Sequence, residues 1–123
     1  MIVGLGIDVV GIARIEGLIA RWGDRIEARV LTESERADAP RTPRRAEWIA
    51  GRVAAKEAGL KALGVPDGVG WQSVEVVSAR PSPPGLRFHG AARERAESMA
   101  IARAHVSITH DAGVAAAVVV LEA

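Results

Sequence analysis

The sequence predicts an α+β fold in which a small antiparallel sheet packs against one long buried helix. Residues 48–64 supply the helix, because apolar side chains recur at helical spacing along an alanine-rich stretch. Residues 2–10, 104–109 and 113–121 supply strands, because their side chains alternate in character. With 123 residues, 49% of them hydrophobic, the chain 1–123 is expected to be a single domain with one sheet and a modest core.

Composition excludes several classes of protein. The chain has no cysteine, which rules out disulfides and thiolate metal sites. Its formal net charge of +1 argues against a globally basic nucleic-acid binder, so a charged partner would have to meet a local patch. No apolar run reaches transmembrane length and Met1 leads into no signal-like segment, so we expect a cytoplasmic protein without a membrane partner.

The first strand, residues 2–10, has two unlike faces. Gly4, Gly6 and Asp8 share one face, and the other is apolar, with Leu5, Ile7 and Val9. Glycine within a strand marks a close approach by another backbone or by a ligand. Both alternatives stay open, because a helix packed on the sheet, with Asp8 capping the helix that follows, would explain the same pattern.

Residues 12–29 are predicted to form a helix, which Gly23 would kink or split. Its apolar stripe consists of Ile15, Ile19, Trp22 and Ile26. Three basic side chains line up on a different face: Arg14, Arg21 and Arg25. That basic face is either solvated or meets a partner.

The segment between the two helices has a start signal and a basic loop. Thr32 and Glu35 form a capping-box pattern, which predicts a short helical turn. Residues 37–45 hold two prolines and three arginines, and are predicted to be a mobile loop. Thr42 and Pro43 offer an N-cap and a first-turn proline for the long helix, and a start a few residues later is the alternative.

The long helix presents two different strips of side chains. Its core stripe is Ile49, Val53, Leu60 and Leu63, and Gly64 with Pro66 ends it. A second strip lies about 90° round the helix and consists of Ala50, Ala54, Glu57 and Lys61. Glu57 and Lys61 are either an ordinary i,i+4 surface pair or groups that meet a ligand.

The rest of the chain is predicted to alternate short elements. They are a turn at 65–70, a strand at 71–79, a proline-rich connection at 80–85, a strand at 86–89, a helix at 90–102 and the last two strands. Residues 110–113 form a tight turn, so the last two strands should pair antiparallel. His105, Ser107 and Thr109 share a polar face that either lines a wet site or is simply half exposed.

Two carboxylates fall on elements that are expected to pack together, namely Asp8 and Glu57. The sequence has no phosphate-binding loop, zinc spacing or recognisable nucleophile. A small number of oxygen ligands suits Mg²⁺, which keeps several waters and takes the rest of its shell from substrate phosphates. Lys61, with Lys56 and Arg52 on the same helix, would neutralise those phosphates. The residues therefore predict a Mg²⁺-assisted phosphoryl-type transfer site.

Three separated segments match one known family: GLGIDVVGIARIE near the start, RVAAKEAGLKALG in the long helix and HVSITHDAGVAAAVVV at the end. They resemble the holo-acyl-carrier-protein synthases, the small bacterial type of 4′-phosphopantetheinyl transferase. The resemblance covers essentially the whole chain and is loose over 32–48 and 80–90. In the second of these regions the family often has a Gly-basic-Pro turn, whereas this chain has Pro83-Pro84-Gly85.

The resemblance implies transfer of the 4′-phosphopantetheine arm of coenzyme A to a serine of apo-acyl carrier protein, leaving adenosine 3′,5′-bisphosphate. It implies that Asp8 and Glu57 bind Mg²⁺ and that Lys61 offsets charge on the phosphate. The serine proton would pass to Glu57 or to a metal-bound water, and the sequence leaves both open. Coenzyme-contacting positions would be Arg52, Lys61, Gly64 and His105.

The resemblance also implies a homotrimer with each site between neighbouring subunits, and an acidic carrier protein of fatty-acid or polyketide synthesis as partner. Arg14, Arg21 and Arg25 would then dock that carrier protein. Two alternatives remain. Another small Mg²⁺-dependent phosphate-handling enzyme would have no reason for the aligned arginines. A non-catalytic interaction protein would show no thermal shift with Mg²⁺ and coenzyme A.

Overall fold

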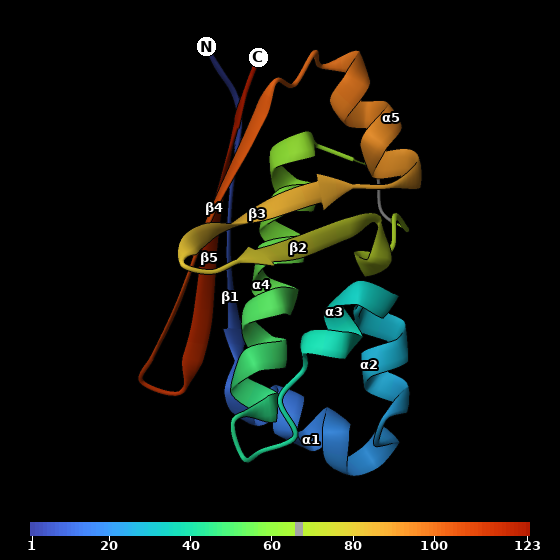
Figure 1. Cartoon of the computed structure of the whole chain (residues 1–123), viewed down its shortest axis with the longest axis vertical. Helices are drawn as coiled ribbons and strands as arrows, with labels where there is room; N and C mark the ends of the chain where they lie inside the picture. Colours follow the sequence, from blue (N-terminus) through green and yellow to red (C-terminus); the bar gives the residue numbers. More distant parts are fainter. Residues whose placement is uncertain (66–67) are drawn as a thin grey trace.

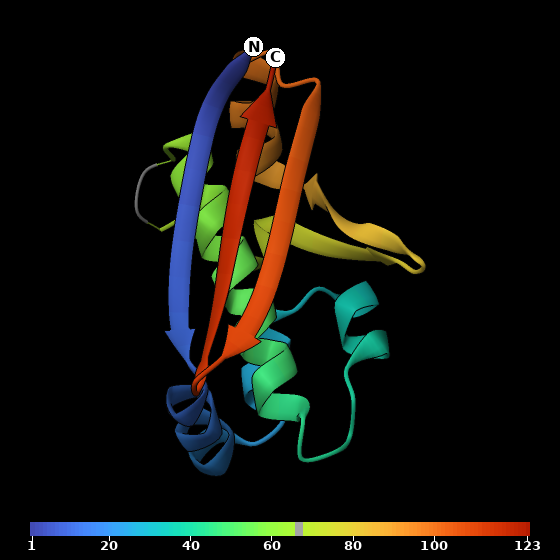
Figure 2. The same cartoon turned by 90° about the vertical axis from the view of Figure 1, so that its left-hand side faces the viewer.

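The computed structural model describes residues 1–65 and 68–123, and it confirms the α+β class with a long buried helix (Figures 1 and 2). The long helix is α4 (Arg45–Leu63). A three-stranded sheet of β1 (Ile2–Gly11), β5 (Val114–Glu122) and β4 (Arg103–Asp111) covers one side of it. A hairpin of β2 (Val74–Ala79) and β3 (Ser82–Phe88) crosses another side. The strands therefore form two sheets, and the expectation of one sheet is wrong.

Five short elements connect these layers. They are α1 (Ile12–Trp22), α2 (Arg25–Val30), α3 (Glu33–Asp38), the 3₁₀ turn η1 (Trp71–Ser73) and α5 (Gly90–Ser98). The predicted antiparallel hairpin of the last two strands is confirmed as β4 and β5. Among the described residues, no helix is both long and apolar enough to cross a membrane.

The three-stranded sheet has β5 in its middle, antiparallel to both neighbours. One face packs on α4 and the other is open, so Figure 2 looks onto the open face with α4 behind it. On the open face, Ile7, Val118 and Ser107 form one row across the strands. The rows beside it are Leu5–Val120–His105 and Val9–Ala116–Thr109. The open face is therefore apolar on β1 and β5 and polar on β4.

The α4 backbone lies so close to β1 that Gly4 and Gly6 admit no side chain. A Cβ at Gly6 would collide with the carbonyl oxygen of Ala58, and one at Gly4 with that of Ala62. Close packing of a helix on the strand is thus the reason for both glycines. Asp8 does not cap the helix that follows, which was part of one of the two alternatives, because the N-cap residue of α1 is Gly11.

Helix α4 is buried on nearly all sides rather than along one stripe. Ile49, Val53 and Leu63 are buried as predicted, whereas Leu60 is half buried. Its small residues are buried as well: Ala46, Ala50, Gly51, Ala54, Ala55, Ala58, Gly59 and Ala62. These small side chains let strands approach the helix from more than one direction, which makes α4 the axis of the fold.

The ends of α4 follow the prediction at one end only. Gly64 ends the helix in the left-handed region at φ 64°, as predicted. The helix begins at Arg45, so Thr42 is not its N-cap, and the later start that the sequence left open is the one observed. The Thr42 hydroxyl instead accepts a hydrogen bond from the Arg44 backbone N–H, outside the helix. The predicted stop at Pro66 lies outside the described residues.

Gly23 splits the predicted helix over 12–29. It adopts φ 58° at the end of α1, and α2 starts at Arg25 in a new direction. Arg25 is therefore on a different helix from Arg14 and Arg21, so the single line of three arginines is broken. Trp22, predicted to be core, is 44% exposed at this break.

Other boundaries differ less. The capping box is confirmed, because Glu35 Oε1 accepts from Thr32 N at 2.8 Å and Thr32 Oγ1 accepts from Glu35 N at 3.2 Å. Since α3 extends to Asp38, the basic loop shortens to 39–44. Strand β3 includes Pro83 and Pro84, which the sequence excluded. An edge strand tolerates proline, because it forms backbone hydrogen bonds with a neighbouring strand on one side only.

Two further segments are shorter than predicted. The predicted strand at 71–79 opens as the 3₁₀ turn η1, so β2 starts at Val74. The predicted helix at 90–102 ends at Ser98, and Ala100 adopts a positive φ of 55° just beyond it. Both changes leave the order of elements as the sequence predicted.

Candidate functional site

Strand β1 presents the Asp8 carboxylate to α4. Asp8 follows Gly6 on the face that packs against the helix, and its side chain is 18% exposed. The Lys61 ammonium Nζ lies 2.9 Å from Asp8 Oδ1 and donates to the carbonyl oxygen of Ile7 at 3.1 Å. The structure therefore brings Asp8 and Lys61 together and holds a positive charge at the carboxylate.

Glu57 lies one turn before Lys61 on α4 but pairs with a different residue. Its Oε1 accepts a hydrogen bond of 2.5 Å from the indole Nε1 of Trp71. Glu57 and Lys61 therefore do not form the i,i+4 ion pair that was one of the two alternatives. Glu57, Lys61 and Gly64 line one open hollow of about 300 Å³. Lys61 joins this hollow to the Asp8 carboxylate.

The chemistry of the two candidate carboxylates suits a magnesium ion. Asp8 and Glu57 offer carboxylate oxygens, and Asp8 already attracts a cationic group. In the part of the chain that the structure describes, no cluster of three or more His, Cys, Asp or Glu side chains could enclose a metal by itself. A pair of carboxylates leaves the remaining coordination positions to water and substrate oxygens, which is how Mg²⁺ is usually bound.

Arg52 faces β2 rather than β1. Its guanidinium lies 4.3 Å from the centre of the Trp48 ring, and its Nη2 donates to Ser78 Oγ at 3.1 Å. Burial lowers the pKa of Arg52, against the attraction of Glu35. Within one chain, Arg52 contacts these groups and not the two candidate carboxylates.

His105 lies on the open face of the three-stranded sheet, on the opposite face from α4. Its Nε2 is 2.5 Å from Glu122 Oε1, and this hydrogen bond lowers the pKa of the Glu122 carboxyl. The predicted polar face of β4 is therefore solvent-facing in a single chain. The sheet separates His105 from Asp8, so the sequence-predicted coenzyme contacts do not all converge within one protomer.

A second hollow, of about 670 Å³, combines basic and apolar groups. Arg14, Arg25 and Arg29 line it, together with Leu18, Trp22, Ile26, Ala28 and Trp71. The Arg25 guanidinium lies 4.8 Å from the centre of the Trp22 ring. Arg21 is exposed on α1 but is not one of the residues that line this hollow. We call this feature the basic hollow.

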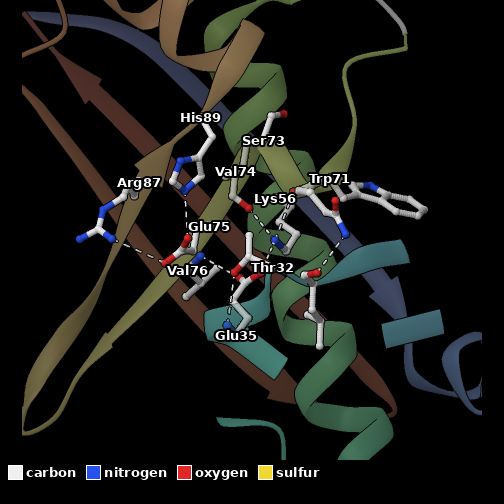
Figure 3. Close-up of polar contacts among 12 residues, drawn as sticks. Thr32, Glu35, Lys56, Trp71, Ser73, Val74, Glu75, Val76, Arg87 and His89 are labelled. Carbon is white, nitrogen blue, oxygen red and sulfur yellow. Dashed lines mark hydrogen bonds and ion pairs between the residues drawn. The ribbon is translucent and has the colours of Figure 1, made fainter. Parts of the chain in front are cut away.

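Lys56 is a structural residue, contrary to the expectation that it neutralises phosphate. It is fully buried, and its Nζ donates to Glu35 Oε1 at 2.6 Å and to the carbonyl oxygens of Val74 and Trp71 at 2.5 and 3.1 Å (Figure 3). The other Glu35 oxygen accepts from Val76 N at 2.8 Å. Burial lowers the pKa of Lys56, and Glu35 opposes that effect. All three ammonium hydrogens are used to join α3, α4, η1 and β2.

Sequence reasoning missed Trp71 and the partner of Glu35. A signal for Trp71 existed, because a half-buried indole N–H needs an acceptor and Glu57 was predicted on the neighbouring helix. The Glu35–Lys56 ion pair had no such signal. The capping box already explained Glu35, and no pattern in the nearby sequence indicates that Lys56 on another helix is its partner.

Comparisons with known proteins agree with one another. The model of the 4′-phosphopantetheinyl transferase superfamily matches residues 4–119. A holo-[acyl-carrier-protein] synthase of Desulfovibrio desulfuricans is 47% identical, with 100% of this chain and 99% of the relative covered. The structure is similar to the crystal structure of the Neisseria meningitidis holo-[acyl-carrier-protein] synthase, with a TM-score of 0.88, 29% identity and 100% of both chains covered. It is also similar to the Helicobacter pylori synthase in complex with coenzyme A, with a TM-score of 0.81, 32% identity, and 96% of this chain and 99% of that chain covered.

Proposed function

Because the chain belongs to the holo-[acyl-carrier-protein] synthases of the 4′-phosphopantetheinyl transferase superfamily, we propose that it transfers the 4′-phosphopantetheine group of coenzyme A to a serine hydroxyl of apo-acyl carrier protein. The reaction depends on Mg²⁺ and releases adenosine 3′,5′-bisphosphate. The observation that carries the proposal is the position of Lys61, which lines one hollow together with Glu57 and is paired with Asp8. The coenzyme A complex of the Helicobacter pylori relative supports the donor.

Asp8 and Glu57 are the residues that would hold the metal. When bound, Mg²⁺ supplies Lewis-acid polarisation of the phosphate and neutralises its charge. Lys61 has a side chain that is 53% exposed, so its ammonium can reach a phosphate in the hollow and offset the charge that accumulates there. Its bond to Asp8 orients both groups before the substrate arrives.

The basic hollow is the proposed docking site of the carrier protein. Arg14 and Arg25 supply positive charge beside apolar surface, which suits a partner that is acidic and also presents apolar side chains. Arg21 extends the positive rim along α1. Since Trp71 lines the basic hollow and hydrogen-bonds Glu57, a protein docked there lies next to the proposed metal ligand.

The open face of the three-stranded sheet is the proposed contact between subunits of a homotrimer. Leu5, Ile7 and Val9 are 66%, 64% and 58% exposed and adjoin the valines of β5, which makes a continuous apolar surface. His105 lies at the β4 edge of the same face. In such a trimer, His105 of one chain would lie near the coenzyme A bound by the neighbouring subunit. This would explain why His105 lies away from Asp8 within one chain.

Incubation of the protein with apo-acyl carrier protein, coenzyme A and Mg²⁺, read by intact mass, tests the proposed reaction. We expect each carrier molecule to gain one 4′-phosphopantetheine group, with release of an equal amount of adenosine 3′,5′-bisphosphate. Chelation of Mg²⁺ with EDTA should stop the transfer, and added Mg²⁺ should restore it. A carrier protein that stays unmodified with all components present would contradict the proposal.

A further inference from the structure

Trp71 lies between the two hollows and contributes to both. Its indole Nε1 donates to Glu57 Oε1, and Glu57 lines the smaller hollow together with Lys61. Its side chain also forms part of the wall of the basic hollow, beside Arg14 and Arg25. One side chain therefore contacts both the proposed metal ligand and the proposed docking surface.

The turn that carries Trp71 is anchored on both sides. The Trp71 carbonyl oxygen accepts from the buried Lys56 ammonium, and the indole points away from that contact (Figure 3). The next residue, Gln72, donates through its Nε2 to the carbonyl oxygens of Ala28 and Leu31 at 2.5 and 3.2 Å. Because these bonds tie η1 to α4 and to the end of α2, the indole N–H reaches Glu57 from a fixed backbone.

We infer that Trp71 is a positioning residue of the transfer reaction. Its indole N–H donates a hydrogen bond to one oxygen of Glu57, which fixes the carboxylate and leaves the second oxygen free to bind Mg²⁺. Because the side chain also walls the basic hollow, a carrier protein docked there presses on the residue that orients Glu57. This inference rests on the proposed role of Glu57 as a metal ligand.

Trp71→Phe tests the role of the N–H, because phenylalanine keeps an aromatic ring and removes the donor. We expect Mg²⁺ affinity, measured by calorimetry with coenzyme A present, to fall by roughly tenfold to a hundredfold, as is usual when a group that orients a metal ligand is lost. Trp48→Phe is the matched control. Its ring lies against Arg52, so this variant should bind Mg²⁺ like the wild type. A folded Trp71→Phe protein with wild-type Mg²⁺ affinity would overturn the inference.

The indole N–H resonances give a second readout that does not require Trp71→Phe to fold. The chain has three tryptophans, so a nitrogen-15 correlation spectrum should show three indole signals. Glu57→Gln should move the Trp71 signal and leave those of Trp22 and Trp48 in place. Titration of the wild type with apo-acyl carrier protein should move the Trp71 signal as well. A Trp71 signal that responds to neither change would equally overturn the inference.

The same calorimetry separates failure of the inference from failure of the proposed function. If Asp8→Asn and Glu57→Gln lose Mg²⁺ binding while Trp71→Phe keeps it, the metal site stands and the positioning role of Trp71 is wrong. If Asp8→Asn and Glu57→Gln both bind Mg²⁺ like the wild type, the proposed metal site itself is wrong, and the inference is wrong with it.

Discussion

One ammonium group makes the two candidate carboxylates different. Asp8 is paired with Lys61, whereas Glu57, only one helical turn before that lysine, is held by a neutral indole. The negative charge of Glu57 is therefore not offset by its hydrogen-bond partner, and that of Asp8 is. Of the two carboxylates that would hold Mg²⁺, Asp8 therefore already has a compensating charge and Glu57 does not.

Neutral isosteres of the two carboxylates should abolish the transfer without unfolding the protein. Asp8→Asn and Glu57→Gln keep the shape of each side chain but remove the charge that would hold Mg²⁺. The measurement is turnover by intact mass over a series of Mg²⁺ concentrations. Glu94→Gln, at an exposed position on α5, is the matched control. Near-wild-type turnover at limiting Mg²⁺ in either variant would rule out a shared metal.

Lys61→Ala should lower turnover more than it weakens coenzyme A binding. The ammonium is half exposed, so it adds little in the ground state, whereas it opposes the charge that develops on the phosphate. Steady-state kinetics with varied coenzyme A gives the turnover number and the Michaelis constant separately. A change in the Michaelis constant alone would assign Lys61 to substrate binding instead.

Gly6→Ala should destabilise the fold, because its methyl group would meet the α4 backbone. The strand and the helix would have to separate, and overpacking of this kind costs roughly 1–3 kcal/mol or more. Gly17→Ala is the matched control. Gly17 is in the middle of α1 with open space around it, so alanine there should stabilise the protein by about 0.5–1 kcal/mol. Thermal unfolding of both variants measures the contrast, and equal stabilities would contradict it.

At the scale of elements, the break between α1 and α2 turns a predicted line of arginines into the rim of a hollow. Arg14 and Arg25 line that hollow from two helices, and Arg21 stands beside it. A concave basic surface next to apolar side chains offers a partner more contact than a straight charged ridge. In the docking proposal, the bend at Gly23 is therefore what places Arg14 and Arg25 around one concave surface.

Charge reversal in the basic hollow should affect the carrier protein and spare coenzyme A. Arg14→Glu combined with Arg25→Glu should raise the Michaelis constant for apo-acyl carrier protein about tenfold or more, because several weak charge contacts are lost together. The constant for coenzyme A should change little. Arg21→Glu should have a smaller effect, and Arg93→Glu, on α5, should have none.

Salt provides a check on that docking prediction. Raising the ionic strength should weaken the use of carrier protein by the wild type and have less effect on the doubly reversed variant. An equal loss for both substrates would point to damaged folding or assembly, and docking at the basic hollow would then be wrong.

Local patterns predicted the elements better than their packing. The capping box at Thr32 and the glycine end of α4 follow from chemistry within a few residues, and both are confirmed. The burial of α4 on nearly all sides depends on a hairpin that arrives later in the chain, so one apolar stripe could not reveal it. The strand character of Pro83 and Pro84 likewise depends on β3 being an edge strand.

For the whole molecule, the sheet face that is open in one chain should be closed in solution. Size-exclusion chromatography with light scattering should give about three times the chain mass of 12.9 kDa. Ile7→Glu places a charge in the middle row of that face and should release monomers that lose activity. Ala91→Glu, at an exposed position on α5, is the matched control. A wild-type protein that runs as a monomer would rule out the trimer.

The candidate site was predictable in part because its members are close along two elements. Asp8 follows two glycines on a strand, and Glu57 and Lys61 lie one turn apart on a helix, so pattern alone put them together. Residue patterns also singled out Arg52 as a phosphate-neutralising group and His105 as part of a polar face, and the family resemblance added the coenzyme contact of each. Within one chain both side chains lie away from the candidate carboxylates. The proposed sharing of the site between subunits would leave no trace in the periodicity of a single sequence.

The central position of β5 bears on how the protein is made. Strand β1 leaves the ribosome before β5, although β5 is its partner in the sheet and the last of the described strands to be synthesised. Until that strand emerges, the nascent polypeptide holds β1 and β4 without the strand that joins them, and α4 without that part of its cover. The β2–β3 hairpin and the short helices depend on contacts between residues that are closer in the sequence, so they can form earlier. The three-stranded sheet can form only after β5 has been synthesised.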